Sequence, residues 1–281
     1  MNNRYKITQF LLSFLMSVSL LVGVGALCLP RILDIANDYL TQTILEETTA
    51  QQKDKKMLEE QMKNRQESLK QKALSDPYSQ ESLHELEYDP ITVPIYAKHL
   101  LGEIYLPAIR QVLPIFDNSS DQFLQRGAAW LANSSELTGG VGKHSVVAGH
   151  SGIPHAKLFN DVPNLKQEDL IVYKISGEYL AYKVTSLQKV TPENTRTVTR
   201  DNNKDLTTLV TCVPIGVNSH RLLVTGERVD FTPSMMKEIE QIKETKEKNN
   251  RLVLIALAIL FVLLFCFLLF MHFKRKKRCK T

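Results

Sequence analysis

Cys212 is the residue of this sequence with the most distinctive chemistry. It ends the run Thr208–Cys212, which reads TLVTC, and Arg221 follows nine residues later. The other cysteines lie in or beside two apolar segments, and they are Cys28, Cys266 and Cys279. Between those segments, Cys212 has no cysteine with which to form an intrachain disulfide. It is either a buried apolar side chain or a nucleophile, and the residues around it favour the nucleophile.

A nucleophilic thiol needs a partner, because it attacks a carbonyl as the thiolate and its ordinary pKa is about 8.5. The histidines between the apolar segments are His84, His99, His144, His150, His155 and His220. His150 is the best placed as the acid or base, because it ends an apolar run and lies between Gly149 and Gly152. His144 falls on the same strand face and is expected to be structural. His220 is the competing base, and the remaining three are expected to be surface residues.

Arg221 begins an apolar run after a loop at 213–220 that contains Pro214, Gly216 and Asn218. If the strands on either side of this loop pair, Cys212 and Arg221 flank it at one end. A guanidinium in that place can stabilise an oxyanion or orient a peptide carbonyl. The alternative is an arginine bound to a surface carboxylate.

Three other chemistries find no support in the sequence. The run 149–152 resembles the serine-hydrolase turn G-x-S-x-G, but Ile153 occupies the fifth position. No Cys or His pair has zinc-ligand spacing, and neither a P-loop nor a dinucleotide fingerprint occurs. We therefore expect no metal site and no bound cofactor.

Two segments, Phe10–Leu29 and Leu252–Met271, each contain 20 residues without a charge, the length that a helix needs to cross a bilayer. Basic residues precede the first segment and crowd residues 274–280 after the second, so both termini are expected in the cytoplasm and the middle outside. A cleaved signal peptide is the alternative for the first segment, with small residues at 25–28. The basic tail adjoins an apolar segment, which favours a membrane surface over a nucleic acid.

The chain has 281 residues, 23% charged and 43% hydrophobic, which suits a globular domain with membrane segments. Residues 34–72 are rich in Glu, Gln, Lys and Leu without Gly or Pro, which predicts one or two exposed helices. Beyond Tyr88, short β-branched and aromatic runs predict a mainly β fold, a closed β-barrel of about eight strands. The predicted strands are 91–96, 103–106, 112–116, 145–148, 170–175, 179–184, 207–211 and 222–225. Short helices are expected at 120–130 and 155–159, a hairpin turn at 176–178, and a charged helix at 235–250.

The TLVTC run, Arg221 and the pair Gly149-His150 resemble the motifs of the sortases, the cysteine transpeptidases of Gram-positive cell surfaces. The resemblance covers about Tyr88 to Val229 and implies a sortase-type barrel. Within the family the chain resembles class C, the pilus-assembling sortases. The features that carry this likeness are the C-terminal apolar segment and the runs 142–145, 152–154, 157–159 and 218–224.

In class C enzymes an Asp-Pro-aromatic motif on a flexible lid covers the active site. Asp76-Pro77-Tyr78 lies where that motif should fall, although the residues alone predict only a turn there. The resemblance implies that Asp76 pairs with Arg221 and that Tyr78 packs over Cys212. The run 88–90 is a weaker lid candidate because no aromatic residue follows its proline.

Two departures from the class C pattern lie at the rim of the expected groove. Ser151 stands where many members have arginine, and Val213–Gly216 stands where many have Thr-Pro-Tyr-Gly. Both departures bear on substrate preference and leave the reaction type unchanged.

The resemblance implies that Cys212 attacks the Thr–Gly bond of an LPxTG-like sorting signal and that His150 protonates the leaving amine. Arg221 would steady the oxyanion or the signal, and a lysine amine of a pilin subunit would release the acyl group. Pilins and surface proteins with such signals would be the partners. The alternatives are a sortase that attaches proteins to peptidoglycan, a cysteine peptidase of this fold, and a non-enzymatic membrane-tethered scaffold.

This interpretation divides the chain into six parts. A cytoplasmic stub and membrane anchor (1–30) precede an extracellular helical region with the lid (31–87) and the catalytic barrel (88–232). A juxtamembrane helix (233–251), a transmembrane helix (252–272) and a basic cytoplasmic tail (273–281) complete it.

Overall fold

The computed structural model describes residues 3–50, 55–68, 76–79, 92–153, 156–197 and 201–278, with the backbone alone for some helical residues. The chain divides into two compact units. One contains Ala36–Lys243, and the other combines the two ends of the chain, Met1–Ile35 and Glu244–Thr281.

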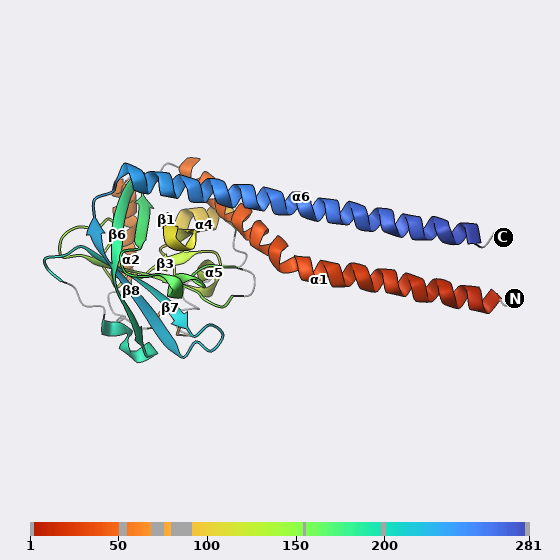
Figure 1. Cartoon of the computed structure of the whole chain (residues 1–281). Helices are drawn as coiled ribbons and strands as arrows, with labels where there is room; N and C mark the ends of the chain where they lie inside the picture. The colour runs from red at the N-terminus through yellow and green to blue at the C-terminus, as the bar shows by residue number, and fades with distance from the viewer. Residues whose placement is uncertain are drawn as a thin grey trace. The chain divides into compact units, whose positions relative to one another are not determined.

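The larger unit is built on a β-barrel, which is closed within the described residues by eight strands in the order β1-β2-β3-β4-β7-β8-β6-β5 (Figure 1). The pairs β2–β3 and β4–β7 are parallel, and the other neighbours are antiparallel. The strands are β1 (Leu100–Leu106), β2 (Gln111–Phe116), β3 (Ala128–Trp130), β4 (His144–Gly149), β5 (Leu170–Ile175), β6 (Glu178–Val190), β7 (Leu206–Val213) and β8 (His220–Val229). The predicted closed barrel is therefore confirmed.

Helices precede, interrupt and follow the barrel. The α-helices are α1 (Asn3–Ala50), α2 (Lys55–Ser68), α4 (Val93–His99), α5 (Asp121–Leu124) and α6 (Pro233–Arg278). Short 3-10 helices lie at η1 (Pro107–Ile109), η2 (Val162–Asn164) and η3 (Pro192–Thr197). The hairpin turn between β5 and β6 places Ser176 and Gly177 at φ values of 50° and 82°, the left-handed pair that a two-residue hairpin turn requires.

Three element predictions were wrong. Residues 93–96 of the first predicted strand belong to α4, because Pro94 lies in the first turn, where a helix needs no amide donor. The predicted helix at 120–130 is the single turn α5 followed by strand β3. Over the described part of 155–159 there is no helix; a 3-10 turn, η2, forms three residues later.

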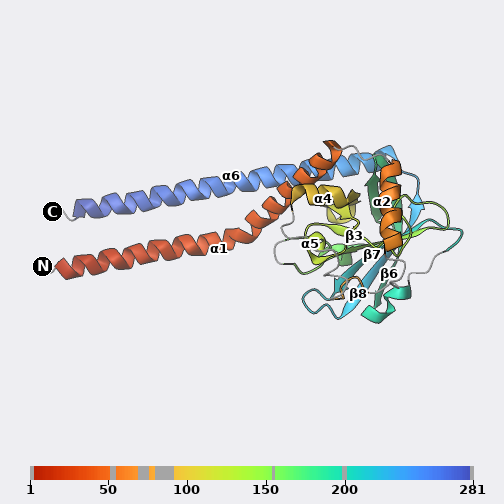
Figure 2. The same ribbon diagram turned by 180° about the vertical axis from the view of Figure 1, so that it is seen from behind.

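The main core fills the barrel and extends to α2. Leu58 and Met62 of α2 are buried in the same apolar cluster as Trp130 and Phe159 from the barrel. Figures 1 and 2 show α2 lying against the barrel. Polar bonds secure the helix, since Arg65 donates through Nε to the carbonyl of Asp117 at 3.0 Å. The helix that precedes the segment 76–79 is thus an integral part of the fold.

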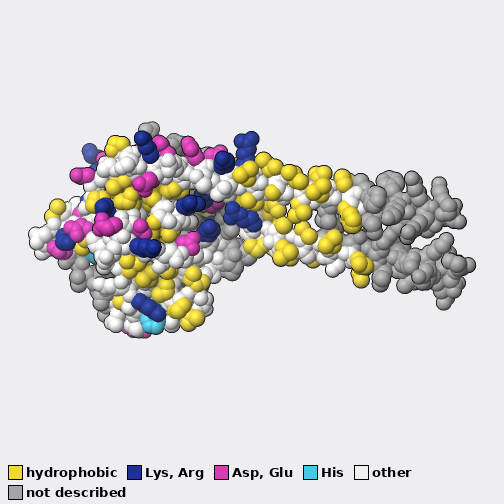
Figure 3. Space-filling model, viewed as in Figure 1, with side chains coloured by type: hydrophobic (Ala, Val, Ile, Leu, Met, Phe, Trp, Pro, Cys, Tyr) yellow, Lys and Arg dark blue, Asp and Glu magenta, His cyan; other side chains and the backbone are white. Residues whose placement is uncertain are grey.

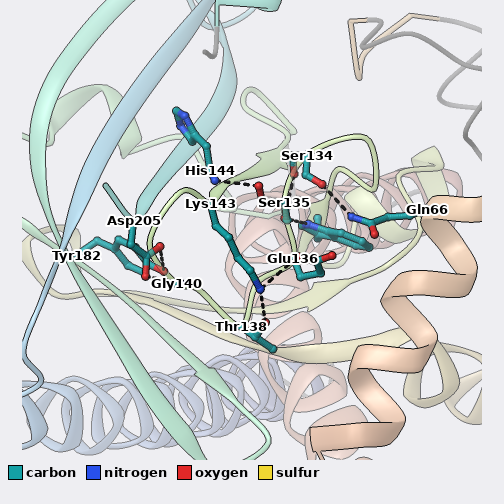
Figure 4. Close-up of polar contacts among 11 residues, drawn as sticks. Gln66, Ser134, Ser135, Glu136, Thr138, Gly140, Lys143, His144, Tyr182 and Asp205 are labelled. Carbon is teal, nitrogen blue, oxygen red and sulfur yellow. Dashed lines mark hydrogen bonds and ion pairs between the residues drawn. The ribbon is translucent and has the colours of Figure 1, made fainter. Parts of the chain in front are cut away.

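The loop between β3 and β4 is fixed by polar contacts on both sides (Figure 4). Gln66 of α2 donates to the carbonyl of Ser134 at 3.0 Å, and the amide of Gly140 donates to Asp205 Oδ2 at 2.7 Å. The amide of His144 donates to Ser135 Oγ at 2.9 Å. These bonds set where β4 begins, and therefore where its far end, which leads into His150, is placed.

One helix among the residues that could be searched is long and apolar enough to span a membrane, Pro233–Phe267. Between Leu252 and Phe267 most of the described apolar side chains are exposed, for example Leu252 at 54% and Phe261 at 66% (Figure 3). The structure therefore supports one of the two predicted spans. The backbone is helical over 10–29, but many side chains there lie outside the described residues, so that span stays a prediction.

Candidate active site

Cys212 and Arg221 are direct register partners on the antiparallel strands β7 and β8. Both side chains are buried, at 5% and 6% exposure. The loop that joins the strands contains Asn218 at a φ of 57°, in the left-handed region that asparagine tolerates better than most residues. Strand pairing thus puts a thiol and a guanidinium side by side at one end of the barrel.

His150 reaches the same end of the barrel by the parallel pairing of β4 and β7. The register pairs Ala148 with Val210, so His150 and Cys212 each lie two residues beyond that pair. Side-chain hydrogen bonds join β4 and β7 beyond their last paired residues. Thr211 Oγ1 donates to the carbonyl of Gly149 at 2.8 Å, and Ser151 Oγ donates to the carbonyl of Cys212 at 2.6 Å. The serine that departs from the class C pattern therefore ties the histidine segment to the cysteine strand.

Asp76 forms a bidentate ion pair with Arg221. Arg221 Nε and Nη2 donate to the two carboxylate oxygens of Asp76 at 2.8 Å and 2.6 Å. Nη1 of the arginine donates to the carbonyls of Asn218 and His220. Such fork-to-fork pairing is among the stronger hydrogen-bond arrangements in proteins. The arginine is thus bound along its Nε–Nη2 edge by Asp76 and through Nη1 by backbone carbonyls.

Tyr78 bridges the strands that carry the thiol and the histidine. Its hydroxyl lies 2.7 Å from the carbonyl oxygens of both Gly149 and Val210, and it accepts the Gly149 amide at 3.0 Å. The hydroxyl has one proton, so it donates to one of the two carbonyls at a time. Its ring lies 5.6 Å from the His150 ring and 5.0 Å from the Arg221 guanidinium carbon. Pro77, between Asp76 and Tyr78, is buried.

Burial dominates the electrostatics of the thiol. Removal from solvent raises the pKa of Cys212 to about 11; Arg221 opposes that rise and Asp76 adds to it. Burial also raises the pKa of Tyr78 well above its ordinary value, and Cys212 adds to the effect. With Asp76 bound to Arg221, the thiol is therefore protonated at neutral pH.

Asp121 is a member of this group that the sequence did not indicate. His150 Nε2 lies 2.9 Å from Asp121 Oδ1. The run Ala128–Trp130 could have pointed to Asp121, but its residues were predicted to be helical. They form a strand that pairs antiparallel with β4, with Ala128 opposite Gly149. Once that pairing is known, the residues just before β3 must lie near those just after β4.

The remaining histidines make other contacts or lie outside the described residues. His144 is buried and bonds Thr208 Oγ1 through Nε2 at 2.7 Å, and His220 bonds Ser219. His99 corrects an expectation, because it is not a surface histidine: it pairs with Asp117 at 2.6 Å with its side chain 12% exposed. His84, His155 and the second lid candidate at 88–90 lie outside the described residues. Among the residues that could be searched, no three His, Cys, Asp or Glu side chains group as metal ligands would.

Comparison with known proteins identifies the family to which this barrel is similar. Residues 104–229 match the sortase domain model, and that range contains Cys212, His150 and Arg221. Sortase A of Bacillus anthracis is 35% identical over 133 residues, which make up 47% of this chain. This chain spans 61% of the length of that relative.

Solved structures of C-type sortases match a longer part of the chain. The pilus-related sortase C of Group B Streptococcus is 32% identical with a TM-score of 0.54, and the match covers 68% of this chain and 97% of that one. Sortase C-1 of Streptococcus pneumoniae is 26% identical with a TM-score of 0.55, over 68% and 98%. With the domain model on the barrel and nearly the whole of a 32% identical sortase matched, this chain belongs to the sortase family.

Proposed function

We propose that this chain is a membrane-anchored cysteine transpeptidase of the class C type. It cleaves an LPxTG-like sorting signal and joins the acyl group to a lysine amine of a pilin subunit. The observation that carries the proposal is the pairing of Cys212 with Arg221 across β7 and β8, with His150 at the end of the neighbouring β4.

The reaction needs two acyl transfers at one sulfur. The Cys212 thiolate attacks the threonine carbonyl, the C–N bond to glycine breaks, and the imidazolium of His150 gives its proton to the leaving amine. The amine of the acceptor lysine then attacks the thioester, the C–S bond breaks, and His150 takes the amine proton. Arg221 stabilises the oxyanion that develops in both steps.

The segment 76–79 acts in this proposal as a lid that must open. While Asp76 holds Arg221, the guanidinium cannot serve an oxyanion, and the pKa of the Cys212 thiol stays near 11. Opening removes the Asp76 charge and leaves Arg221 to favour the thiolate. Closing over a thioester would exclude water, the competing acceptor.

The barrel is proposed to lie outside the cell, held by two spans with both termini in the cytoplasm. The exposed apolar residues of α6 support the C-terminal span, and the basic residues at 274–280 support its orientation. Protease treatment of intact cells, with tags at both termini, tests this topology. Cleavage of either tag from outside would contradict it.

The reaction is tested with the full chain in nanodiscs, a sorting-signal peptide and a pilin domain that carries the acceptor lysine. We expect an isopeptide-linked product and an acyl-enzyme on Cys212, and neither with Cys212→Ala. A cell-wall amine tested in parallel separates wall attachment from pilin joining. If the peptide is only hydrolysed, the chain is a peptidase. If the sorting-signal peptide forms no acyl-enzyme on Cys212 and no product appears with either acceptor, the chain is a scaffold and the proposal fails.

A further inference from the structure

The histidine of the site is held by a carboxylate from a different part of the barrel. His150 follows β4, and Asp121 is the first residue of α5. Nε2 of the ring and Oδ1 of Asp121 are 2.9 Å apart, with 12% of the His150 side chain and 38% of the Asp121 side chain exposed. This is the distance of a charge-assisted hydrogen bond.

The carboxylate is itself held in place. Its second oxygen, Oδ2, accepts a bond from Gln125 Nε2, one helical turn further along. The pairing of Ala128 with Gly149 brings the chain just after α5 to the end of β4. The orientation of Asp121 therefore follows from the fold and from Gln125, and not from His150 alone.

Four described groups that carry or can carry charge come from the elements at this end of the barrel. They are Asp121 from α5, Tyr78 from the segment 76–79, Cys212 from β7 and Arg221 from β8, and the first two contact the His150 ring. Arg221 is already paired with Asp76, and Tyr78 is bound through its hydroxyl to backbone groups. Among these four, Asp121 is the anion in contact with the imidazole.

We propose that Asp121 is the positioning residue of His150. By accepting a hydrogen bond from Nε2–H, Asp121 fixes the orientation of the ring and leaves Nδ1 to exchange a proton with the substrate amine and the thiol. Its negative charge stabilises the imidazolium, the form that must accompany a thiolate. The effect on catalysis rests on the proposed function, whereas the effect on the titration of His150 does not.

The coupled titration of Cys212 and His150 gives this proposal a specific signature. If the active form is thiolate with imidazolium, its fraction at intermediate pH depends on the gap between the two pKa values. A lower pKa for His150 widens the gap and reduces the active fraction. Below both pKa values the histidine is fully protonated in any case, and the active fraction then depends on Cys212 alone.

Asp121→Asn tests the signature, because it keeps the shape and removes the charge. In the full chain in nanodiscs, we expect kcat/KM to fall about tenfold on the plateau of the pH profile, because the variant lacks the carboxylate that stabilises the imidazolium. The acid limb should move to lower pH, so that variant and parent converge there. Asp121→Glu should recover most of the activity. A loss by the same factor at every pH would overturn the proposal.

A titration that needs no activity completes the test. The His150 signal in the histidine-labelled chain is followed by NMR and assigned by its loss in His150→Ala. Asp121→Asn should move its midpoint to lower pH, because a negative charge beside the ring is lost, and Asp201→Asn, which changes a carboxylate in the loop before β7, should leave it in place. An unchanged midpoint in Asp121→Asn would overturn the proposal. If the parent shows no acyl transfer, the proposed function fails, and this titration alone decides the role of Asp121.

Discussion

Asp76 and Arg221 lie 145 residues apart in the sequence and are joined by two hydrogen bonds of 2.8 Å and 2.6 Å. Arg221 Nη1 also donates to the carbonyls of Asn218 and His220, and the Tyr78 ring lies against the face of the guanidinium. The segment 76–79, the proposed lid, is therefore attached at two different points, one through the Asp76 ion pair and one through the Tyr78 hydroxyl. The two attachments can be removed separately.

Removal of the ionic attachment should expose and activate the thiol. In Asp76→Asn one acceptor oxygen and the negative charge are lost, and the pKa of Cys212, which Asp76 raises, should fall. We expect alkylation of Cys212 by iodoacetamide at pH 8 to accelerate roughly tenfold, since a drop of about one unit gives ten times more thiolate. Asp169→Asn, a change in the loop before β5, is the control. Equal rates in Asp76→Asn and the parent would contradict the lid.

The hydroxyl of Tyr78 should contribute separately from its ring. Tyr78→Phe keeps the apolar packing but removes the bridge to the Gly149 and Val210 carbonyls. A net loss of about 1 kcal/mol per hydrogen bond predicts roughly fivefold faster labelling of Cys212, and Tyr78→Ala should label faster still. Hydrogen exchange at the Gly149 amide, which donates to this hydroxyl, provides an independent measurement. If Tyr78→Phe labels at the same rate as the parent, the hydroxyl bridge has no role in closure.

Local patterns predicted most of the barrel, and two of the three wrong element predictions are explained by tertiary contacts. Residues 93–96 alternate like a strand, yet Ile95 and Tyr96 pack as part of a helix against α1 and β2. The three residues of β3 are too few for a period to be recognised, and their strand character comes from pairing with β2 and β4. In both places tertiary contacts override a weak local signal.

The site was predictable to the extent that its residues lie on paired strands. Cys212 and Arg221 flank one short loop, so their meeting follows from a single hairpin. Asp121 could not be found in the same way, because its contact with His150 depends on the short strand β3. The contact between Asp76 and Arg221, 145 residues apart, was suggested only by the family resemblance. Nothing in the local sequence of 76–79 indicates that this segment lies beside the thiol.

The helix α2 should stabilise the whole barrel, and the single tryptophan reports on it. Met62 is fully buried in the cluster that contains Trp130. We expect Met62→Ala to lower the free energy of unfolding by about 2–5 kcal/mol, as for other large-to-small core changes. Urea unfolding of the full chain followed by Trp130 fluorescence measures this. Met57→Ala, on the same helix but at a position 54% exposed, should change stability by no more than about 0.5 kcal/mol. Equal effects would show that α2 is not part of the core.

Arg221→Lys should separate the charge of the arginine from its shape. A lysine keeps the positive charge beside Cys212 but cannot form the paired bonds that Nε and Nη2 make to Asp76. If the planar fork also holds the oxyanion, kcat should fall by about 100- to 1,000-fold, the usual loss for one such donor.

The same variant should weaken the lid, so its thiol should be alkylated faster than that of the parent even while turnover falls. This opposite movement is the expected result, and an unchanged Trp130 emission spectrum in Arg221→Lys would show that the fold is intact, because an unfolded site would also expose the thiol. The measurement pairs single-turnover acylation by a sorting-signal peptide with iodoacetamide labelling of Cys212 in one preparation. Retained acylation with unchanged labelling would mean that Arg221 acts as a point charge only, and that the two-pronged bond to Asp76 neither closes the site nor prepares the arginine for the oxyanion.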